Sequence, residues 1–225
     1  MSAVLNVQRS ITGQPWRWRG LAADSRGGLV PDDLVTHLLL ARGVARDELD
    51  IHKAPSTRAF MPDPSIFRDR DTAPEQLADA IEQREQVAIF GDYDVDGATS
   101  AALLILLLRD LGLEARPYIP DRLMEGYGPS GEALVRLKRE GAGLIVTVDC
   151  GAQAFEALDM ARDAGAEVIV VDHHKCTTEL PAALALVNPN RLDEDEGAAH
   201  GHLAAVGVAW LLGAALVRVL RGRGH

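Results

Sequence analysis

From about residue 74 onward, short apolar runs alternate with longer segments of helical period. Five short runs, most of them rich in Val, Ile and Leu, have the length of buried strands and cover residues 87–90, 115–119, 144–148, 168–171 and 184–187. Helical patterns cover residues 74–86, 98–111, 130–140, 152–164 and 203–220. Strands that alternate with helices indicate βαβ units, because each parallel crossover needs a helix to return the chain. We therefore predict an α/β fold with a doubly wound, mostly parallel five-stranded sheet.

The first 72 residues lack this alternation. A helix is predicted from Pro31 to about Ala41, and prolines at 55, 62 and 64 interrupt the stretch that follows. We expect an irregular N-terminal arm over residues 1–72 and one α/β domain over residues 73–225. The last helix is strongly apolar and lies close to the final residue. We therefore expect the chain to be the first part of a longer one.

Acidic residues and a histidine pair follow three of the predicted strands. They are Asp92, Asp94 and Asp96 after the first strand, Asp149 after the third, and Asp172, His173 and His174 after the fourth. The carboxyl ends of parallel strands meet at one edge of a sheet, where ligands bind in open α/β folds. Neighbouring carboxylates repel one another unless a positive charge lies among them, and hard divalent cations prefer oxygen ligands. The sequence therefore predicts a metal site at this edge.

Simpler interpretations explain part of this pattern. An Asp in a strand-to-helix turn can cap the helix, which would account for one of the three acids after the first strand. We assign Asp94 and Asp96 to the metal, and Asp92 to a supporting or structural position behind the ligands. A solvent-exposed turn is the alternative for the histidine pair. Because imidazole titrates near neutrality, one histidine could bind metal while the other reaches substrate or supplies a proton.

The loop over residues 120–128 follows the second predicted strand. The guanidinium of Arg122 is a planar fork that suits phosphate, although a surface salt bridge is the simpler interpretation. Glycines on both sides of Tyr127 indicate a loop that lets another molecule approach closely.

Charge and cysteine content narrow the possible classes. The formal net charge of −10 argues mildly against a nucleic-acid binder, which usually has a basic surface. Part of the acidic excess is the cluster itself, which bound metal would offset. Cys150 and Cys176 form no CxxC pair, so neither a zinc site nor a disulfide framework is indicated. We expect a cytoplasmic protein with no membrane partner.

Together these motifs resemble those of the DHH phosphoesterase superfamily. The segments that carry the resemblance are Gly91-Asp92-Tyr93-Asp94-Val95-Asp96-Gly97, Val148-Asp149-Cys150-Gly151 and Asp172-His173-His174. Three further segments resemble its RecJ branch of bacterial single-strand-specific exonucleases, namely Ile119-Pro120-Asp121-Arg122, Glu125-Gly126-Tyr127-Gly128 and Val187-Asn188-Pro189-Asn190. The resemblance covers about residues 45–220 in order and spacing.

This resemblance implies two divalent ions, Mn²⁺ or Mg²⁺, and 5′-to-3′ degradation of single-stranded DNA in recombination and repair. The positions that match metal ligands are Asp94, Asp96, Asp149 and His173, with Asp172 behind them. Asp149 would bridge the ions, and His174 would contact the scissile phosphate or assist proton transfer. Arg122 would contact DNA. A single-strand-binding protein or a helicase would be a candidate partner.

This chain differs from the superfamily pattern in two respects. Many members have a metal-ligand histidine where this chain has Phe90. The resemblance also implies a further metal-binding Asp, a DHHA1-type domain and an OB-like domain beyond residue 225. Rival interpretations are a nanoRNA or cyclic-dinucleotide phosphodiesterase, a family II pyrophosphatase, and a binding module without catalytic activity.

Overall fold

The computed structural model describes residue 3, residues 6–17 and residues 34–225, which form two units. The first unit extends to Met61 and the second covers Pro62–His225. The described helices of the first unit are α1 (Leu34–Ala41), η3 (Arg46–Glu48), α2 (Leu49–Lys53) and α3 (Thr57–Phe60). None of these four short helices buries a residue, as expected for an irregular arm. The predicted helix ends at Ala41, and its predicted start at Pro31 lies outside the described residues.

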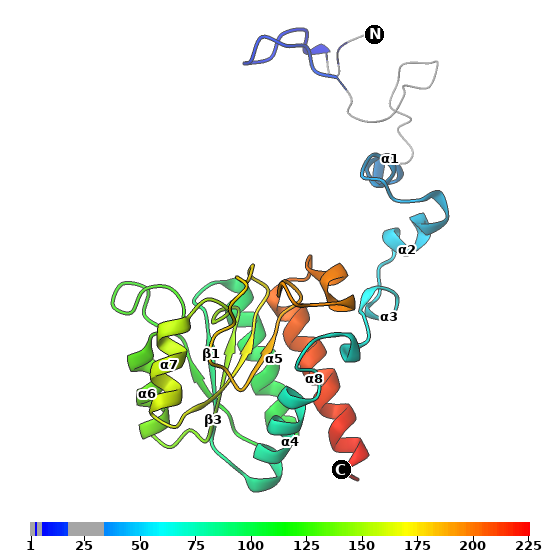
Figure 1. The fold of residues 1–225 in the computed structure, drawn as a ribbon. Coiled ribbons are helices and arrows are strands. Elements are labelled where there is room, and N and C mark those ends of the chain that lie inside the picture. Colours follow the sequence, from blue (N-terminus) through cyan, green and yellow to red (C-terminus); the bar gives the residue numbers. More distant parts are fainter. Residues whose placement is uncertain (1–2, 4–5, 18–33) are drawn as a thin grey trace. The chain divides into compact units, whose positions relative to one another are not determined.

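The second unit contains a five-stranded sheet in which all neighbouring strands are parallel (Figure 1). The strands are β1 (Val87–Gly91), β2 (Arg116–Tyr118), β3 (Leu144–Val148), β4 (Glu167–Val171) and β5 (Ala185–Val187). Their order is β2-β1-β3-β4-β5. β2 is added on one side of β1 and the later strands on the other side, so the order of strand addition reverses between β1 and β3. Doubly wound sheets of this order bind ligands beside that reversal. The predicted fold class is confirmed.

Helices cover both faces of the sheet (Figure 1). α6 (Gly131–Arg139) and α7 (Phe155–Asp163) lie on one face, and α4 (Thr72–Gln83), α5 (Val95–Asp110) and α8 (Ala205–Gly222) lie on the other. Every residue of β1 and β3 is buried, which explains their continuous apolar sequence. Ala88 and Phe90 of β1 pack in the same core as Leu134, Leu137 and Leu158 of the α6 and α7 layer.

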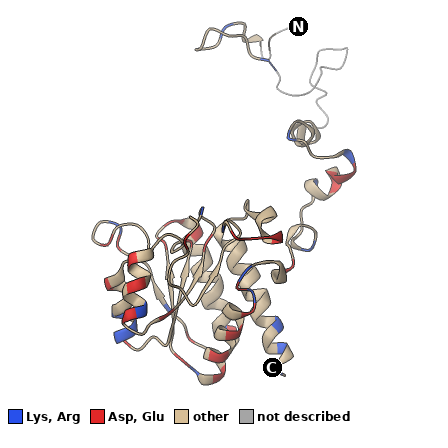
Figure 2. Cartoon of the chain, in the orientation of Figure 1, with Lys and Arg blue, Asp and Glu red and all other residues tan. Residues whose placement is uncertain are grey.

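α8 is, within the described part of the chain, the helix long and apolar enough to cross a membrane by length and composition. Its buried residues include Val208, Leu212, Leu216 and Leu220, which recur at helical spacing, and the helix packs against α5 and α4. Arg223, which follows the helix, pairs with three acidic residues of α4. Figure 2 shows basic positions near the carboxyl end of the chain and acidic positions along α4. α8 therefore has the burial and packing of a core helix.

The segment that precedes α4 is fixed to the sheet by a buried arginine. Arg191 has a side chain that is 6% exposed, and it pairs with Asp69 and Asp193 at 2.7 and 2.8 Å. The Asp69 carboxylate also accepts a hydrogen bond from the backbone N–H of Leu186 in β5. Residues 62–72, which we assigned to the arm, thus belong to the compact second unit in the structure.

Candidate metal centre

One register row of the sheet places four polar residues side by side. The last paired residues of β1, β3, β4 and β5 are Gly91, Val148, Val171 and Val187. The residues that follow them are Asp92, Asp149, Asp172 and Asn188, all of which are buried. The three acids continue the ladder, since each backbone N–H donates to the last residue of the next strand. The sheet therefore holds these four side chains at one level of its carboxyl edge.

The turn after β1 presents Asp94 and buries Asp92. The Asp94 carboxylate caps α5 by accepting the backbone N–H of Gly97 at 3.0 Å, and this bond holds the pKa of Asp94 below its usual range. A Cβ atom on Gly97 would lie 2.4 Å from the carbonyl oxygen of Asp92, so glycine is required there for the backbones to approach. The turn thus brings both Asp92 and Asp94 towards the end of β3.

Asp149 lies at the centre of the candidate site. It has a φ of +62°, a left-handed conformation that costs a non-glycine residue about 1 kcal/mol or more. Single oxygen atoms of Asp92, Asp94 and Asp149 all lie within 4.8 Å of one another. Burial, followed by the proximity of Asp94, raises the pKa of Asp149 to about 7. Burial also raises the pKa of Asp92.

Three of these carboxylate oxygens have no hydrogen-bond partner among the described residues. They are both oxygens of Asp92 and Oδ1 of Asp149. A buried polar atom without a partner costs about 1–3 kcal/mol, and more when it is charged. The cluster is therefore poorly satisfied by the protein alone and fits a cation.

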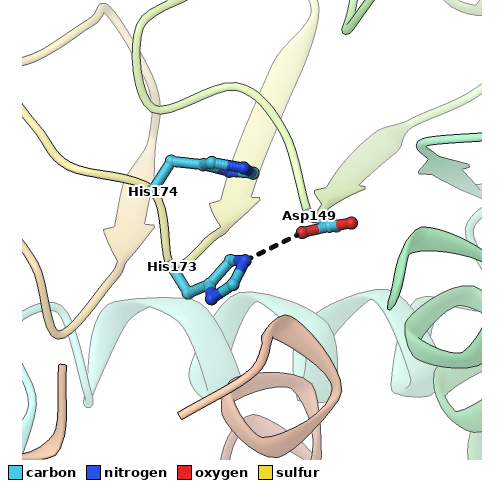
Figure 3. Close-up of side chains that lie close together, drawn as sticks. All are labelled: Asp149, His173 and His174. Carbon is cyan, nitrogen blue, oxygen red and sulfur yellow. Dashed lines mark ion pairs between the residues drawn. The ribbon is translucent and has the colours of Figure 1, made fainter. Parts of the chain in front are cut away.

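His173 turns an unprotonated nitrogen towards Asp149. Its Nδ1 lies 3.0 Å from the carbonyl oxygen of Leu203. Because a carbonyl can only accept, Nδ1 carries the hydrogen and Nε2 of the neutral ring is left with a lone pair. Nε2 lies 3.3 Å from Asp149 Oδ1. A dashed line marks this pair in Figure 3, but the two atoms do not have hydrogen-bond geometry. Two electron-pair donors thus face the same space, which is the arrangement that a metal ion requires.

His174 is held by a different carboxylate. Its Nδ1 lies 2.7 Å from Asp172 Oδ1, and this bond raises the pKa of His174. Burial acts to raise the pKa of Asp172, but hydrogen bonds from His174 and from the Ala152 N–H outweigh it and leave the pKa below its usual value. Nε2 of His174 is 3.4 Å from the hydroxyl of Tyr127. Asp172 therefore orients His174 and leaves Nε2 beside the exposed side chain of Tyr127.

The predicted site residues fall into two groups that share Asp149. One group contains Asp92, Asp94 and Asp149, and the other contains Asp149, His173 and His174. Asp96 lies in the first turn of α5 and belongs to neither group among the residues that the structure describes. The structure thus places Asp92, which the sequence predicts behind the ligands, in the same group of close carboxylates as Asp94 and Asp149.

Arg122 is exposed and lies against aromatic side chains. Its guanidinium carbon is 5.1 Å from the ring centre of Tyr93. The Tyr93 ring is 6.1 Å from that of Tyr127, which is 6.4 Å from the His174 ring. Arg122 is therefore linked to the centre through two aromatic rings, at the rim of the site.

Sequence reasoning did not single out Asn188 as part of the polar row. The signal was present, because Asn188 follows the fifth predicted strand as Asp149 follows the third. The acids are identified by the repulsion between neighbouring carboxylates. An amide is uncharged and does not repel its neighbours, so this argument does not identify Asn188. Its side chain contacts the backbone of the histidine pair, with Nδ2 2.9 Å from the carbonyl oxygen of His174.

Comparison with known proteins agrees with this geometry. Residues 86–219, more than half of the chain, match the DHH family, N-terminal domain. The single-stranded-DNA-specific exonuclease RecJ of Bacillus subtilis is 37% identical over 193 residues, which are 82% of this chain and 23% of that protein. RecJ of Escherichia coli is 42% identical over 155 residues, 68% of this chain and 26% of that protein. The chain thus spans about a quarter of the length of these relatives.

A solved structure shows the same likeness. The crystal structure of exonuclease RecJ bound to manganese superposes with a TM-score of 0.57 at 38% identity, over 66% of this chain and 37% of that one. The family match covers the three strand ends that carry the acids and the histidine pair. This chain therefore belongs to the DHH family.

Proposed function

We propose that this chain carries the metal-binding catalytic part of a nuclease that hydrolyses phosphodiester bonds of single-stranded DNA from the 5′ end. The observation that carries this proposal is the set of unpartnered buried oxygens on Asp92 and Asp149 that faces the unprotonated Nε2 of His173. The relatives from Bacillus subtilis and Escherichia coli are single-stranded-DNA-specific exonucleases, which supports the choice of substrate. DNA recombination and repair in the cytoplasm would be the setting, with single-strand-binding proteins or helicases as partners.

The ligands present fit Mn²⁺ or Mg²⁺. Carboxylate oxygens with one imidazole suit these ions, whereas thiolate-preferring metals would need sulfur ligands. We assign Asp94, Asp149 and His173 as ligands, with Asp149 shared because it belongs to both groups of close side chains. The sequence motif adds Asp96 as a ligand, although Asp96 lies outside both groups of described residues. Two such ions, when bound, activate water and stabilise charge on the attacked phosphate. Asp92 would stabilise the positive charge from behind, since its carboxylate is buried.

His174 would act on the phosphate. Because Asp172 holds Nδ1, the ring cannot rotate freely and Nε2 stays beside the hydroxyl of Tyr127. The raised pKa keeps more of the imidazole protonated near neutral pH, so Nε2 can donate a hydrogen bond or a proton. Arg122 at the rim would bind a second phosphate of the strand.

A cavity beside the centre offers room for substrate. It has a volume of about 800 Å³, and its lining includes Asp172, His174 and Tyr127 together with residues of α7 such as Phe155 and Met160. Its mixed polar and apolar lining would accept a sugar and base next to a phosphate held at the metal centre.

Substrate comparison tests this proposal. The chain is incubated with Mn²⁺ and, in separate reactions, with 5′-phosphorylated single-stranded DNA, the dinucleotide pApA and pyrophosphate, with protein in excess over substrate. We expect the DNA to be the preferred substrate and mononucleotides to be the product. A faster reaction with pApA or pyrophosphate would contradict the proposal. Binding of Mn²⁺ and DNA without hydrolysis of any substrate would favour the binding module instead.

A further inference from the structure

We propose that Asn190 is a positioning residue for His173, because its side-chain amide fixes the backbone segment that sets the tautomer of that imidazole. The expected effect on Mn²⁺ affinity rests on the proposed metal role of His173, whereas the expected effect on the tautomer does not.

The orientation of the Asn190 amide follows from its three partners. Nδ2 lies 2.6 Å from the carbonyl oxygen of His173 and 3.1 Å from that of Gly201, and both oxygens can only accept. Oδ1 lies 2.7 Å from the ammonium nitrogen of Lys175, which can only donate. The opposite amide orientation would oppose like groups at all three contacts. Asn190 is therefore a bridge between the histidine turn and the segment around Gly201.

This bridge controls the position of the Leu203 carbonyl. Residues 201–204 lie between η5 (Glu196–His200) and α8 and belong to no strand. Local turn bonds hold the segment, with the N–H of Leu203 donating to the carbonyl oxygen of His200 at 3.0 Å. The Asn190 amide also links Gly201 to His173, because its Nδ2 donates hydrogen bonds to the carbonyl oxygens of both residues. Since the Leu203 carbonyl accepts the Nδ1 hydrogen of His173, this link holds donor and acceptor in place.

Two further contacts show that the bridge is closely fitted. The backbone N–H of Asn190 donates to Oδ1 of buried Asn188 at 2.8 Å, which fixes the backbone from which the amide extends. A Cβ atom on Gly201 would lie 2.6 Å from Asn190 Oδ1. The backbone of Gly201 is right-handed helical, so alanine would be allowed there by its backbone and would disturb only this contact.

Without the bridge, the two tautomers of His173 should become closer in energy. If the Leu203 carbonyl moves away, Nδ1 loses its acceptor and the ring is free to turn, so that the hydrogen can move to Nε2 and be donated to Asp149 Oδ1 instead. That tautomer closes the space between Nε2 and Asp149 and removes the lone pair that a cation would need. Second-layer hydrogen bonds of this kind typically change metal affinity by about 10- to 100-fold.

The test is ¹⁵N NMR of the imidazoles in the metal-free chain, followed by Mn²⁺ calorimetry. The variants are Asn190→Asp, which replaces the donor by a carboxylate of similar shape, and Gly201→Ala, which pushes the amide away. Gln153→Ala is the matched control, since Gln153 Nε2 also donates to the backbone of the histidine turn, at Lys175, and the side chain is exposed. Circular dichroism confirms that each variant is folded.

We expect wild type and Gln153→Ala to show His173 with the hydrogen on Nδ1. Asn190→Asp and Gly201→Ala should show a shift towards the Nε2–H form and a Mn²⁺ affinity at least about tenfold weaker. If Asn190→Asp fails to fold, Gly201→Ala decides the question. Retention of the Nδ1–H form in the folded variants, or an equal shift in Gln153→Ala, would overturn the proposal. The tautomer is measured without metal or substrate, so this result is separate from any failure of the proposed nuclease activity.

Discussion

The Nε2 atom of His173 and the Oδ1 atom of Asp149 lie 3.3 Å apart without hydrogen-bond geometry. The Leu203 carbonyl holds the imidazole hydrogen on the opposite nitrogen, so two electron-pair donors face each other. They come from the ends of adjacent parallel strands, β4 and β3. This relationship is difficult to explain by folding stability alone and supports our proposal that both atoms bind one divalent ion.

Asp149→Asn should separate the stability of the site from its function. In the absence of metal at pH 8, we expect the variant to unfold at a higher temperature than wild type, because a buried, unpartnered carboxylate is replaced by a neutral amide. The gain should be about 1–3 kcal/mol. With Mn²⁺ the order should reverse, since wild type gains stability from the bound ion. Thermal unfolding with EDTA and with Mn²⁺ measures both effects.

The control for this comparison is Asp163→Asn, because the Asp163 side chain is 74% exposed and its ion pair lies on the surface. It should change the unfolding temperature appreciably neither with EDTA nor with Mn²⁺.

The activity of the site depends on the same residue. In hydrolysis of single-stranded DNA, Asp149→Ala should lose nearly all metal-dependent activity. Retention of roughly a tenth of the wild-type rate would argue against a bridging carboxylate.

His174→Ala should slow hydrolysis while Mn²⁺ affinity stays close to that of wild type. The reason is that Asp172 already binds Nδ1 of His174, and Nε2 lies beside the hydroxyl of Tyr127. Loss of a group that assists proton transfer typically costs about 10²- to 10⁴-fold in rate. Calorimetry and single-turnover kinetics measure the two effects. The assignment of the histidines is reversed if His174→Ala weakens Mn²⁺ binding more than His173→Ala does.

Arg122→Ala should raise KM for single-stranded DNA and leave Mn²⁺ affinity unchanged, because a guanidinium cannot bind a cation but can bind phosphate. Arg122→Lys keeps the charge and loses the planar fork, so we expect an intermediate KM. Arg162→Ala is the control, since Arg162 pairs only with acidic neighbours of α7 in the described structure and is exposed. An unchanged KM in Arg122→Ala would make Arg122 an ordinary surface residue.

Most of the fold could be predicted because each strand is short, apolar and bounded by turn residues. The third strand is found at the predicted residues 144–148. Each of the other four strands differs from its predicted range by one residue at one or both ends. Parallel pairing followed from the helices between the strands, and the meeting of Asp149 with the turns after β1 and β4 followed from parallel pairing. The sequence was thus sufficient to place the acids at one edge.

The side-chain geometry of the site could not be predicted in the same way. Whether Asp92 or Asp96 turns towards Asp149 depends on the close approach of Gly97 to the Asp92 backbone, which no periodicity encodes. The tautomer of His173 depends on the carbonyl of Leu203, thirty residues further along the chain. Hydrogen bonds from distant backbone atoms leave no pattern in the sequence around the histidine pair.

Stability below neutral pH should depend on the pair formed by Arg191 and Asp193. The hydrogen bond from the Arg191 guanidinium lowers the pKa of Asp193 in the folded protein. The stability from this pair is therefore present above the unfolded pKa of about 3.9 and is lost as the pH falls through the lower folded pKa. We expect Asp193→Asn to be less stable than wild type at pH 7, with the difference shrinking below pH 4. Urea unfolding from pH 7 to pH 3 checks this, and a constant difference would contradict it.

The central claim is that His173 and Asp149 bind the same divalent ion. Pulsed electron paramagnetic resonance of the chain with Mn²⁺ tests it most directly, because a nitrogen ligand couples to the electron spins of the ion. We predict an imidazole ¹⁴N coupling in wild type, its loss in His173→Ala, and its retention in the control His202→Ala, whose side chain is exposed. Mn²⁺ bound without nitrogen coupling in wild type, or coupling that survives in His173→Ala, would contradict the account.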